Sequence, residues 1–318
     1  MKVAPKRMNK SIRICIGFIC LFLSSCTLTD SYKKLSHDEK DITLTTVGDL
    51  YQFMSYQQSR VPLVSAHRGG PQSGFPENAI ETFEKTAKQQ PIIIECDIAI
   101  TKDSVLVLMH DERLDRTTTG VGFVRDYTYD EVAKLRLKDP DGVTTKFKVP
   151  TLADALAWGK NKVIFTLDVK RGVPYEHVIE EIRRQQAETR SILITYSAGQ
   201  AEKVHKLAPD LMISASIRTK EDLLRLNDRG VPDNRLVAFV GTREADSEIY
   251  RILHEHGIMC ILGTMGNLDK QAAVRGDVLY YDLIDQGADI LSTDRPVEVG
   301  LQLKKYREDY RLTSDFIR

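Results

Sequence analysis

The sequence lacks an excess of charge of either sign. Its 318 residues include 45 Lys and Arg and 45 Asp and Glu, so the formal net charge at pH 7 is zero. A protein that binds nucleic acid usually has a clear basic excess, and this balance argues against that class. With 42% hydrophobic and 28% charged residues, the composition is that of an ordinary globular protein. It excludes a disordered, collagen-like or multi-span membrane chain.

The sequence also lacks long hydrophobic runs. The most apolar segment is a short one near the N-terminus. Residues 1–25 contain Lys and Arg but no Asp or Glu, and Ile12–Leu23 is largely apolar but too short for a good spanning helix. The run ends in Leu23-Ser24-Ser25-Cys26, which resembles a bacterial lipobox. We therefore expect a lipoprotein signal peptide over 1–25, lipidation of Cys26 and a lipid-anchored location in the bacterial cell envelope. An ordinary secretory signal and an uncleaved anchor are the alternatives.

Cysteine is scarce in the rest of the chain. Cys15, Cys20 and Cys26 lie near the N-terminus, which leaves Cys96 and Cys260 in apolar, strand-like runs. Two isolated cysteines make neither a disulfide framework nor a zinc site. We expect both thiols to be buried as small hydrophobic groups.

From residue 61 onward, short apolar runs alternate with segments that have apolar residues at helical spacing. Near-continuous apolar runs are typical of parallel strands covered on both faces. The expected strands are 61–66, 91–100, 163–169, 192–196, 212–216, 236–240, 259–262 and 289–291. The expected helices include 79–89, 175–186, 200–207, 221–228, 247–255 and 270–285. Eight strands, most followed by a helix, predict a single-domain TIM (β/α)8 barrel, and an open doubly wound sheet is the alternative.

The domain organisation follows from this alternation. We expect a signal peptide at 1–25, a tether and N-terminal packing segment at 26–60 with a helix around 47–56, and the barrel at 61–318. Residues 105–158 interrupt the rhythm with an extra apolar run, a polar loop and short helices near 130–135 and 152–158. Elaborated loops of this kind often carry functional residues.

Polar side chains gather where the early apolar runs end. They are His67, Arg68, Glu95, Asp97, His110, Asp168 and Lys170. Because side chains two residues apart share one face of a strand, Glu95 and Asp97 point the same way, as do Asp168 and Lys170. In a barrel the carboxyl ends of the strands form the active-site face, so we expect these groups to meet there.

The three carboxylates need positive charge, because an unpaired carboxylate is costly to bury. Arg68 or Lys170 could supply it as an ion pair. The alternative is a divalent metal ion bound by carboxylate oxygens. Since Glu95, Asp97 and Asp168 outnumber the two cations nearby in the pattern, we favour the metal.

An ordered set of motifs resembles one known family. The motifs are His67-Arg68-Gly69-Gly70, Pro76-Glu77-Asn78, Glu95-x-Asp97, His110-Asp111, Arg116-Thr117-Thr118, Asp168-x-Lys170 and Thr293-Asp294-Arg295-Pro296. Together they look like the glycerophosphodiester phosphodiesterases, over residues 61 to 296. The resemblance implies a TIM barrel, and it implies metal-dependent hydrolysis of glycerophosphodiesters to glycerol 3-phosphate and an alcohol.

The resemblance also implies a role for each matching residue. His67 and His110 would be the acid and base, and Arg68 and Lys170 would bind the phosphate. The ligands of one Ca²⁺ or Mg²⁺ ion would be Glu95, Asp97 and Asp168. The family usually has Glu at the position of Asp168, and residues 262–267 replace a Trp-Thr type motif near the seventh strand. The resemblance therefore does not fix the geometry of the metal site or the residues that contact the alcohol part of the substrate.

We expect a small phosphodiester as the substrate, contact with a membrane through the lipid anchor, and no nucleic acid. One alternative is a phosphodiesterase that acts on lysophospholipids or glycerophosphoinositol. Another, from a different class, is a non-catalytic surface lipoprotein that only binds phosphodiesters. All the residues that the family motif requires are present apart from the Glu-to-Asp replacement at 168, which favours an enzyme.

Overall fold

The structure is a computed structural model that describes residues 40–318. The expected signal peptide, the expected lipidation site Cys26 and the first part of the expected tether lie outside the described residues. Among the residues described, no helix is both long and apolar enough to cross a membrane. Cys96 and Cys260 are buried free thiols, as expected.

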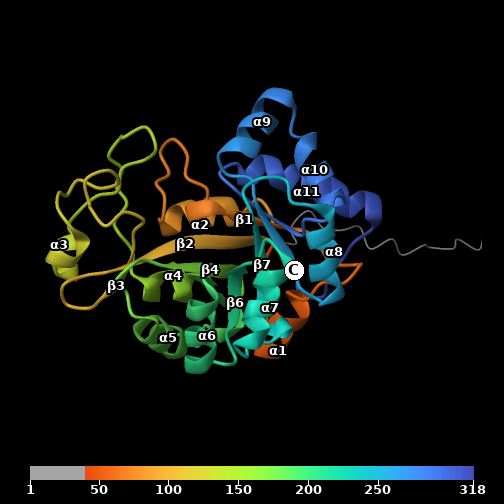
Figure 1. Ribbon diagram of the computed structural model, residues 1–318. Coiled ribbons are helices and arrows are strands. Elements are labelled where there is room, and N and C mark those ends of the chain that lie inside the picture. Colours follow the sequence, from red (N-terminus) through yellow and green to blue (C-terminus); the bar gives the residue numbers. More distant parts are fainter. Residues whose placement is uncertain (1–39) are drawn as a thin grey trace, which may run out of the picture. The chain divides into compact units, whose positions relative to one another are not determined.

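Eight parallel strands close into a ring (Figure 1). β1 (Leu63–Ala66) pairs with β2 (Ile92–Ile100) on one side and with β9 (Ile290–Thr293) on the other. The other barrel strands are β4 (Ile164–Val169), β5 (Ser191–Thr195), β6 (Met212–Ser216), β7 (Leu236–Gly241) and β8 (Cys260–Gly263). Every predicted strand is present within two residues of its expected bounds. Because β1 closes the ring, the prediction of a TIM barrel is confirmed and an open sheet is excluded.

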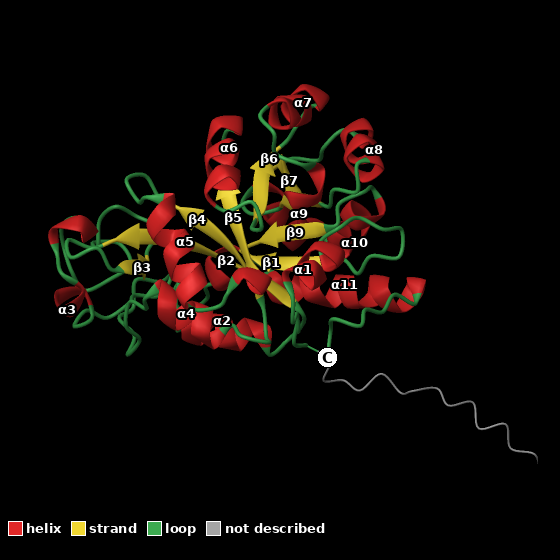
Figure 2. Ribbon diagram, turned by 90° about the horizontal axis from the view of Figure 1, so that it is seen from below, coloured by secondary structure: helices red, strands yellow, loops and turns green. Residues whose placement is uncertain are grey.

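Helices surround the barrel (Figure 2). The helices that follow β1 in the chain, apart from the short α3 described below, are α2 (Ile80–Ala87), α4 (Leu152–Trp158), α5 (Tyr175–Arg184), α6 (Ala198–Leu207), α7 (Lys220–Asp228), α8 (Ser247–Glu255), α9 (Asn267–Arg275), α10 (Val278–Asp285) and α11 (Pro296–Tyr310). The prediction of one helix over 270–285 is wrong. At Gly276 the backbone φ is +112°, which ends α9, and a new helix begins after Asp277.

The expected elaborated loop forms a lobe beside the barrel. β3 (Leu106–Leu108) pairs antiparallel with the end of β2, and the short α3 (Tyr129–Val132) lies far from the other helices (Figures 1 and 2). α3 is shorter than the predicted 130–135. The lobe has a small core of its own: Ala79, Ala99, Val107, Met109, Leu114, Val124, Val132, Leu137 and Val149. This packing fixes the segment that carries His110.

One end of the barrel interior is sealed by apolar side chains, which we call the floor. The floor residues are Leu63, Ile93, Ile164, Ile192, Met212, Val237 and Ile290, one from each of seven barrel strands, and Met259, which directly precedes β8. Beneath it packs the segment before β1, including α1 (Val47–Phe53), through Ile42, Leu50 and Met54. Residues 40–60 therefore pack against the floor of the barrel, within the range predicted for a tether and packing segment.

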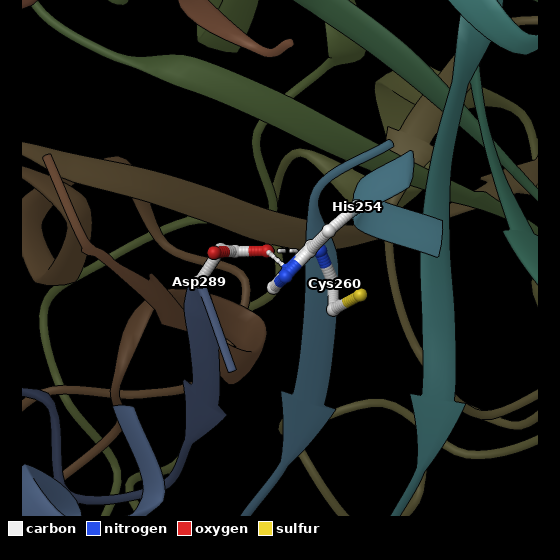
Figure 3. A group of neighbouring side chains, drawn as sticks. All are labelled: His254, Cys260 and Asp289. Atoms are coloured by element: carbon white, nitrogen blue, oxygen red, sulfur yellow. Dashed lines mark hydrogen bonds and ion pairs between the residues drawn. The ribbon is translucent and has the colours of Figure 1, made fainter. Parts of the chain in front are cut away.

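An ion-pair cluster anchors this segment at the same end of the barrel. The buried carboxylate of Asp289 accepts hydrogen bonds from Arg60 Nε (2.5 Å) and from the backbone N–H of Cys260 (2.7 Å), and His254 Nε2 lies 2.9 Å away. The ring of Tyr56 stacks on that of His254, with 3.5 Å between centroids. The sulfur of Cys260 points away from the other two side chains (Figure 3), and burial raises the pKa of its thiol. His254, Cys260 and Asp289 are residue types that can bind a metal ion. Because Arg60 already neutralises the Asp289 carboxylate, we assign this cluster a structural role.

Candidate active site

A cavity of about 230 Å³ opens at the end of the barrel opposite the floor. Six of the predicted site residues line it: His67, Glu95, Asp97, His110, Asp168 and Lys170. The seventh, Arg68, contacts this group through its backbone N–H, which donates to Glu95 Oε2 at 2.8 Å. The barrel therefore brings together residues that were predicted from separate strand ends.

The three carboxylates form one buried group. Asp97 on β2 and Asp168 on β4 are register partners in neighbouring parallel strands, and Glu95 lies two residues before Asp97. One oxygen of each carboxylate lies within 4.8 Å of the others. Asp168 Oδ1 is buried without a hydrogen-bond partner. The group has the ligand chemistry of a divalent metal site, since hard cations prefer oxygen ligands.

Two cations partly compensate this group. Lys170 Nζ lies 2.6 Å from Asp97 Oδ1 and 2.6 Å from Asp168 Oδ2, and Arg68 Nε lies 3.6 Å from Asp97 Oδ2. The ion pairs that we weighed against a metal are therefore present. Neither cation forms an ion pair with Glu95. Burial and the negative charge of Asp97 raise the pKa of the Glu95 carboxyl to about 8. The carboxylate group is short of positive charge.

Asn78 holds Asp97 in place. Its amide Nδ2 donates to Asp97 Oδ2 at 2.7 Å, and its Oδ1 accepts from the backbone N–H of Asp97 at 3.0 Å. Burial opposes ionisation of Asp97, but Lys170 and the Asn78 amide outweigh it and lower the pKa of this carboxyl. Asn78 thus orients the carboxylate of Asp97 and, together with Lys170, keeps it ionised.

The tight turn after β1 aims Arg68 at Glu95. Arg68 and Gly69 both have positive φ, at +52° and +84°. A Cβ on Gly69 would lie 2.2 Å from the Phe83 ring, so only glycine fits at this position. The strained turn over His67–Gly69 places the His67 side chain and the Arg68 N–H on the cavity side.

His67 is held by a carboxylate from the far end of the chain. Its Nδ1 lies 2.7 Å from Oδ1 of Asp294, which follows β9. Burial alone would lower the pKa of His67, but Asp294 and the negative charge of Glu95 outweigh burial and raise it. Asp294 is itself fixed, because its backbone N–H donates to the buried carboxylate of Asp269 at 2.8 Å. Tyr280 and Thr293 also donate to Asp269.

His110 has a carboxylate partner of a different kind. Its Nδ1 lies 2.7 Å from Asp111 Oδ1, and Arg116 donates two hydrogen bonds to Asp111, at 2.7 and 2.9 Å. Arg116 holds the pKa of Asp111 well below its usual range. The same guanidinium donates twice to Glu77, which also accepts from Arg68 Nη1 at 3.1 Å. A continuous polar chain therefore connects His110 to the phosphate-binding candidate Arg68.

Both imidazoles use Nδ1 for a carboxylate, which leaves Nε2 free for the cavity. In a neutral ring this arrangement places the proton on Nδ1 and makes Nε2 the acceptor. The site therefore presents two oriented imidazoles and two cations around one buried carboxylate group. Such a constellation can bind a phosphoryl group and move a proton on each side of it.

Sequence reasoning assigned no role to several residues that build the site. They are Glu77, Asp111, Arg116, Asp269, Asp294 and the inward-facing hydroxyls of Ser65, Thr166, Ser214 and Ser292. Glu77, Asp111, Arg116 and Asp294 belong to the quoted motifs. The contacts of Asp294 with His67 and of Arg116 with Glu77 join distant segments of the chain. The hydroxyls did leave a local trace, since each is a polar residue at an inward position of an apolar strand.

Comparisons with known sequences and structures point to a single protein family. The sequence model of the Glycerophosphoryl diester phosphodiesterase family matches residues 67–248. A glycerophosphoryl diester phosphodiesterase from Parabacteroides distasonis is 36% identical in sequence, with a TM-score of 0.78 over 84% of this chain and 95% of that one. An uncharacterised protein of Bacillus subtilis is 31% identical over 76% of this chain and 98% of its own length.

A glycerophosphodiester phosphodiesterase of Caldanaerobacter subterraneus is 35% identical over 48% of this chain and 65% of its own length. The family match spans the His67 turn, the three carboxylates and the lobe that carries His110. The predicted enzyme class, a phosphoric diester hydrolase, is thereby confirmed. The chain belongs to the glycerophosphoryl diester phosphodiesterase family.

Proposed function

We propose that this protein hydrolyses glycerophosphodiesters to glycerol 3-phosphate and an alcohol, with one bound Ca²⁺ or Mg²⁺ ion. The observation that carries the proposal is the pair of imidazoles, each oriented by a carboxylate, that line one cavity with three further carboxylates. Arg68 and Lys170 add the positive charge that a phosphodiester needs.

The carboxylate group fits a divalent ion. Asp168 Oδ1 is buried and unpartnered, and burial together with the negative charge of Asp97 raises the pKa of Glu95. Glu95, Asp97 and Asp168 would hold the ion. A bound ion would supply positive charge against the negative charge of the phosphate.

The two imidazoles have different partners, and this difference supports different roles. Asp294 pairs with no Lys or Arg within residues 40–318, so its full negative charge supports a proton on His67. The charge of Asp111 is already shared with Arg116. We therefore assign His67 as the base that takes the proton from the attacking hydroxyl at Nε2. His110 then donates a proton from Nε2 to the leaving alcohol oxygen.

The attacking hydroxyl is that of water or the 2-hydroxyl of the glycerol unit. In the second case a cyclic phosphate forms first and is then hydrolysed, and His110 changes from acid to base between the two steps. In both cases Arg68 and Lys170 bind the phosphate and offset the charge that develops on it. Trapping a cyclic phosphate in single-turnover reactions distinguishes the two routes.

The test is release of choline from glycerophosphocholine by the protein lacking residues 1–26. We expect turnover that stops with chelator and recovers with Ca²⁺ or Mg²⁺. His67→Ala and His110→Ala should each nearly abolish turnover while the circular dichroism spectrum is unchanged. Wild-type activity in either variant contradicts the assignment. Binding without turnover in the metal-loaded wild type would instead favour a non-catalytic phosphodiester-binding protein.

We also propose that the signal over 1–25 is removed and that lipidated Cys26 anchors the protein in the cell envelope. The basic flank, the short apolar run and Leu-Ser-Ser-Cys support this proposal. Metabolic labelling with a fatty acid should mark the wild type and leave Cys26→Ser unlabelled. Labelling of the variant contradicts the proposal.

A further inference from the structure

The loop that follows β9 is fastened to the helices α9 and α10 at three successive residues. Thr293 Oγ1 donates to the carboxylate of Asp269 and lies 2.9 and 3.0 Å from its two oxygens. The backbone N–H of Asp294 donates to Asp269 Oδ2 at 2.8 Å. Arg295 Nη1 lies 3.3 Å from the hydroxyl of Tyr280, which itself donates to Asp269 Oδ1 at 2.9 Å. The Asp269 carboxylate is therefore the common acceptor of the contacts that hold this loop.

Asp269 and Tyr280 meet because the helix breaks between them. They are 11 positions apart, and in one continuous helix about 16 Å would separate them along the axis. Instead α9 ends at Arg275, the φ of Gly276 is +112°, and α10 begins at Val278. The two helices contact each other (Figure 1). The break that the sequence did not predict therefore brings the Tyr280 hydroxyl to the Asp269 carboxylate.

Asp269 is a buried carboxylate without a cation of its own. It is 4% exposed, and no Lys or Arg in the described part of the chain forms an ion pair with it. A buried carboxylate is costly unless hydrogen bonds and dipoles stabilise its charge. Here three donor groups do so, together with its place in the first turn of α9. Two of the three donors, from Thr293 and Asp294, belong to the loop after β9, so the buried charge and the shape of this loop depend on each other.

Packing does not hold the side chain of Asp294. It is 48% exposed, and among residues 40–318 its carboxylate has one partner, Nδ1 of His67, at 2.7 Å. A half-exposed carboxylate gains rotamer freedom and hydration when it leaves its partner. The pair therefore persists only while the backbone of Asp294 is held where its side chain reaches His67.

We infer that Asp269 is a positioning residue for turnover, which fixes the backbone of Asp294 and thereby keeps the Asp294 carboxylate at His67. The inference rests on the proposed function, in which His67 is the base. Asp269 does not line the cavity, so it acts through Asp294 and not on the substrate. Because it does not contact the phosphate-binding candidates Arg68 and Lys170, its loss should lower kcat and leave KM nearly unchanged.

The test uses the protein lacking residues 1–26, loaded with Ca²⁺ or Mg²⁺, with glycerophosphocholine as substrate. Asp269→Asn keeps the shape of the side chain but removes its charge and one acceptor oxygen. It should lower kcat about tenfold, as expected when a catalytic group is displaced slightly. In the Asp294→Asn background the same substitution should lower kcat no further, because the carboxylate that Asp269 positions is already gone.

Two further comparisons separate positioning from damage to the fold. Thr293→Val removes the hydroxyl that donates to Asp269 while keeping the side-chain shape, and it should lower kcat in the same way. Thr293→Ser keeps the hydroxyl and should restore most of kcat. Tyr280→Phe should lower kcat a few-fold, whereas Tyr281→Phe is the matched control. The Tyr281 hydroxyl donates to Asp309 at 3.1 Å, and its loss should leave kcat unchanged.

The outcomes distinguish this inference from the proposed function. If Asp269→Asn keeps the wild-type kcat, or lowers kcat by the same factor with and without Asp294→Asn, the inference is wrong and the proposed function stands. If Asp269→Asn does not fold, as judged by its circular dichroism spectrum, Thr293→Val in the two backgrounds decides in the same way. If the metal-loaded wild type releases no choline, both fall.

Discussion

His67 Nδ1 and Asp294 Oδ1 lie 2.7 Å apart, although 227 positions separate the two residues in the chain. The contact exists because β1 and β9 are neighbours in the closed ring, and each residue follows the end of its strand. The last strand of the barrel therefore orients an imidazole on the first. We regard Asp294 as a positioning residue, since it acts through His67.

Asp294→Asn should lower kcat of glycerophosphocholine hydrolysis by about 100-fold while KM changes little. The amide cannot stabilise a proton on His67, and it allows the wrong tautomer. Steady-state kinetics over a range of pH checks this. Without Asp294 the pKa of His67 should fall, so the acidic limb of the pH–rate profile should move to lower pH. Asp294→Glu should restore part of kcat.

Asp233→Asn is the matched control for Asp294→Asn. Asp233 Oδ2 lies 2.7 Å from Nδ1 of His256, which makes a second His–Asp pair that does not line the cavity. Its loss should leave kcat and the pH profile unchanged. Equal effects of the two substitutions would show that Asp294 acts only on the fold.

A second expectation concerns Arg116, which bridges Asp111 and Glu77. Arg116→Ala should lower kcat about tenfold, or about 1.4 kcal/mol in the activation free energy, because Asp111 is then free to leave His110. Arg113→Ala in the same loop breaks the pair with Asp115 and should have no effect on kcat. Should both variants keep wild-type kcat, the polar chain from His110 to Arg68 has no part in turnover.

Proton release should accompany metal binding. In the metal-free protein Glu95 has a pKa of about 8, because burial and Asp97 disfavour its charge. Below that pH a metal must displace the proton, so affinity should rise with pH and level off above about 8. One displaced proton corresponds to about tenfold in affinity per pH unit. Calorimetric titration of the chelator-treated protein at several pH values measures this.

Glu95→Gln is the comparison for that experiment. The amide has no proton to displace, so the variant should bind the metal more weakly and with little dependence on pH between 6 and 8. A flat profile in the wild type would mean that Glu95 is already ionised or is not a ligand.

The fold was predictable because the barrel strands are buried on both faces. Each strand therefore appears in the sequence as an apolar run, and the bounds agree within two residues. The boundary between α9 and α10 was missed, since only Gly276 and Asp277 separate the two adjoining helices. Because side chains two residues apart share one face of a strand, the sequence alone also placed Glu95 beside Asp97.

The partners of the catalytic candidates could not be predicted in the same way. Asp294 reaches His67 only through the closure of the ring, which no local pattern encodes. Glu77 and Asp111 meet through Arg116, whose place depends on the packing of the lobe. The inward-facing hydroxyls of Ser65, Thr166, Ser214 and Ser292 were visible in the sequence, but their place in the cavity required the direction of each strand's inner face.

The turn after β1 should be the most sensitive glycine position near the site. Gly69→Ala places a Cβ 2.2 Å from the buried ring of Phe83 at a φ of +84°, and we expect it to lower the free energy of unfolding by about 2–4 kcal/mol. Gly74→Ala is the control: its φ is +75°, but no atom lies within 4 Å of the added Cβ, so only the backbone cost of about 1 kcal/mol remains. Urea unfolding measures both values. Equal losses would mean that Phe83 moves aside freely and that packing does not set the conformation of this turn.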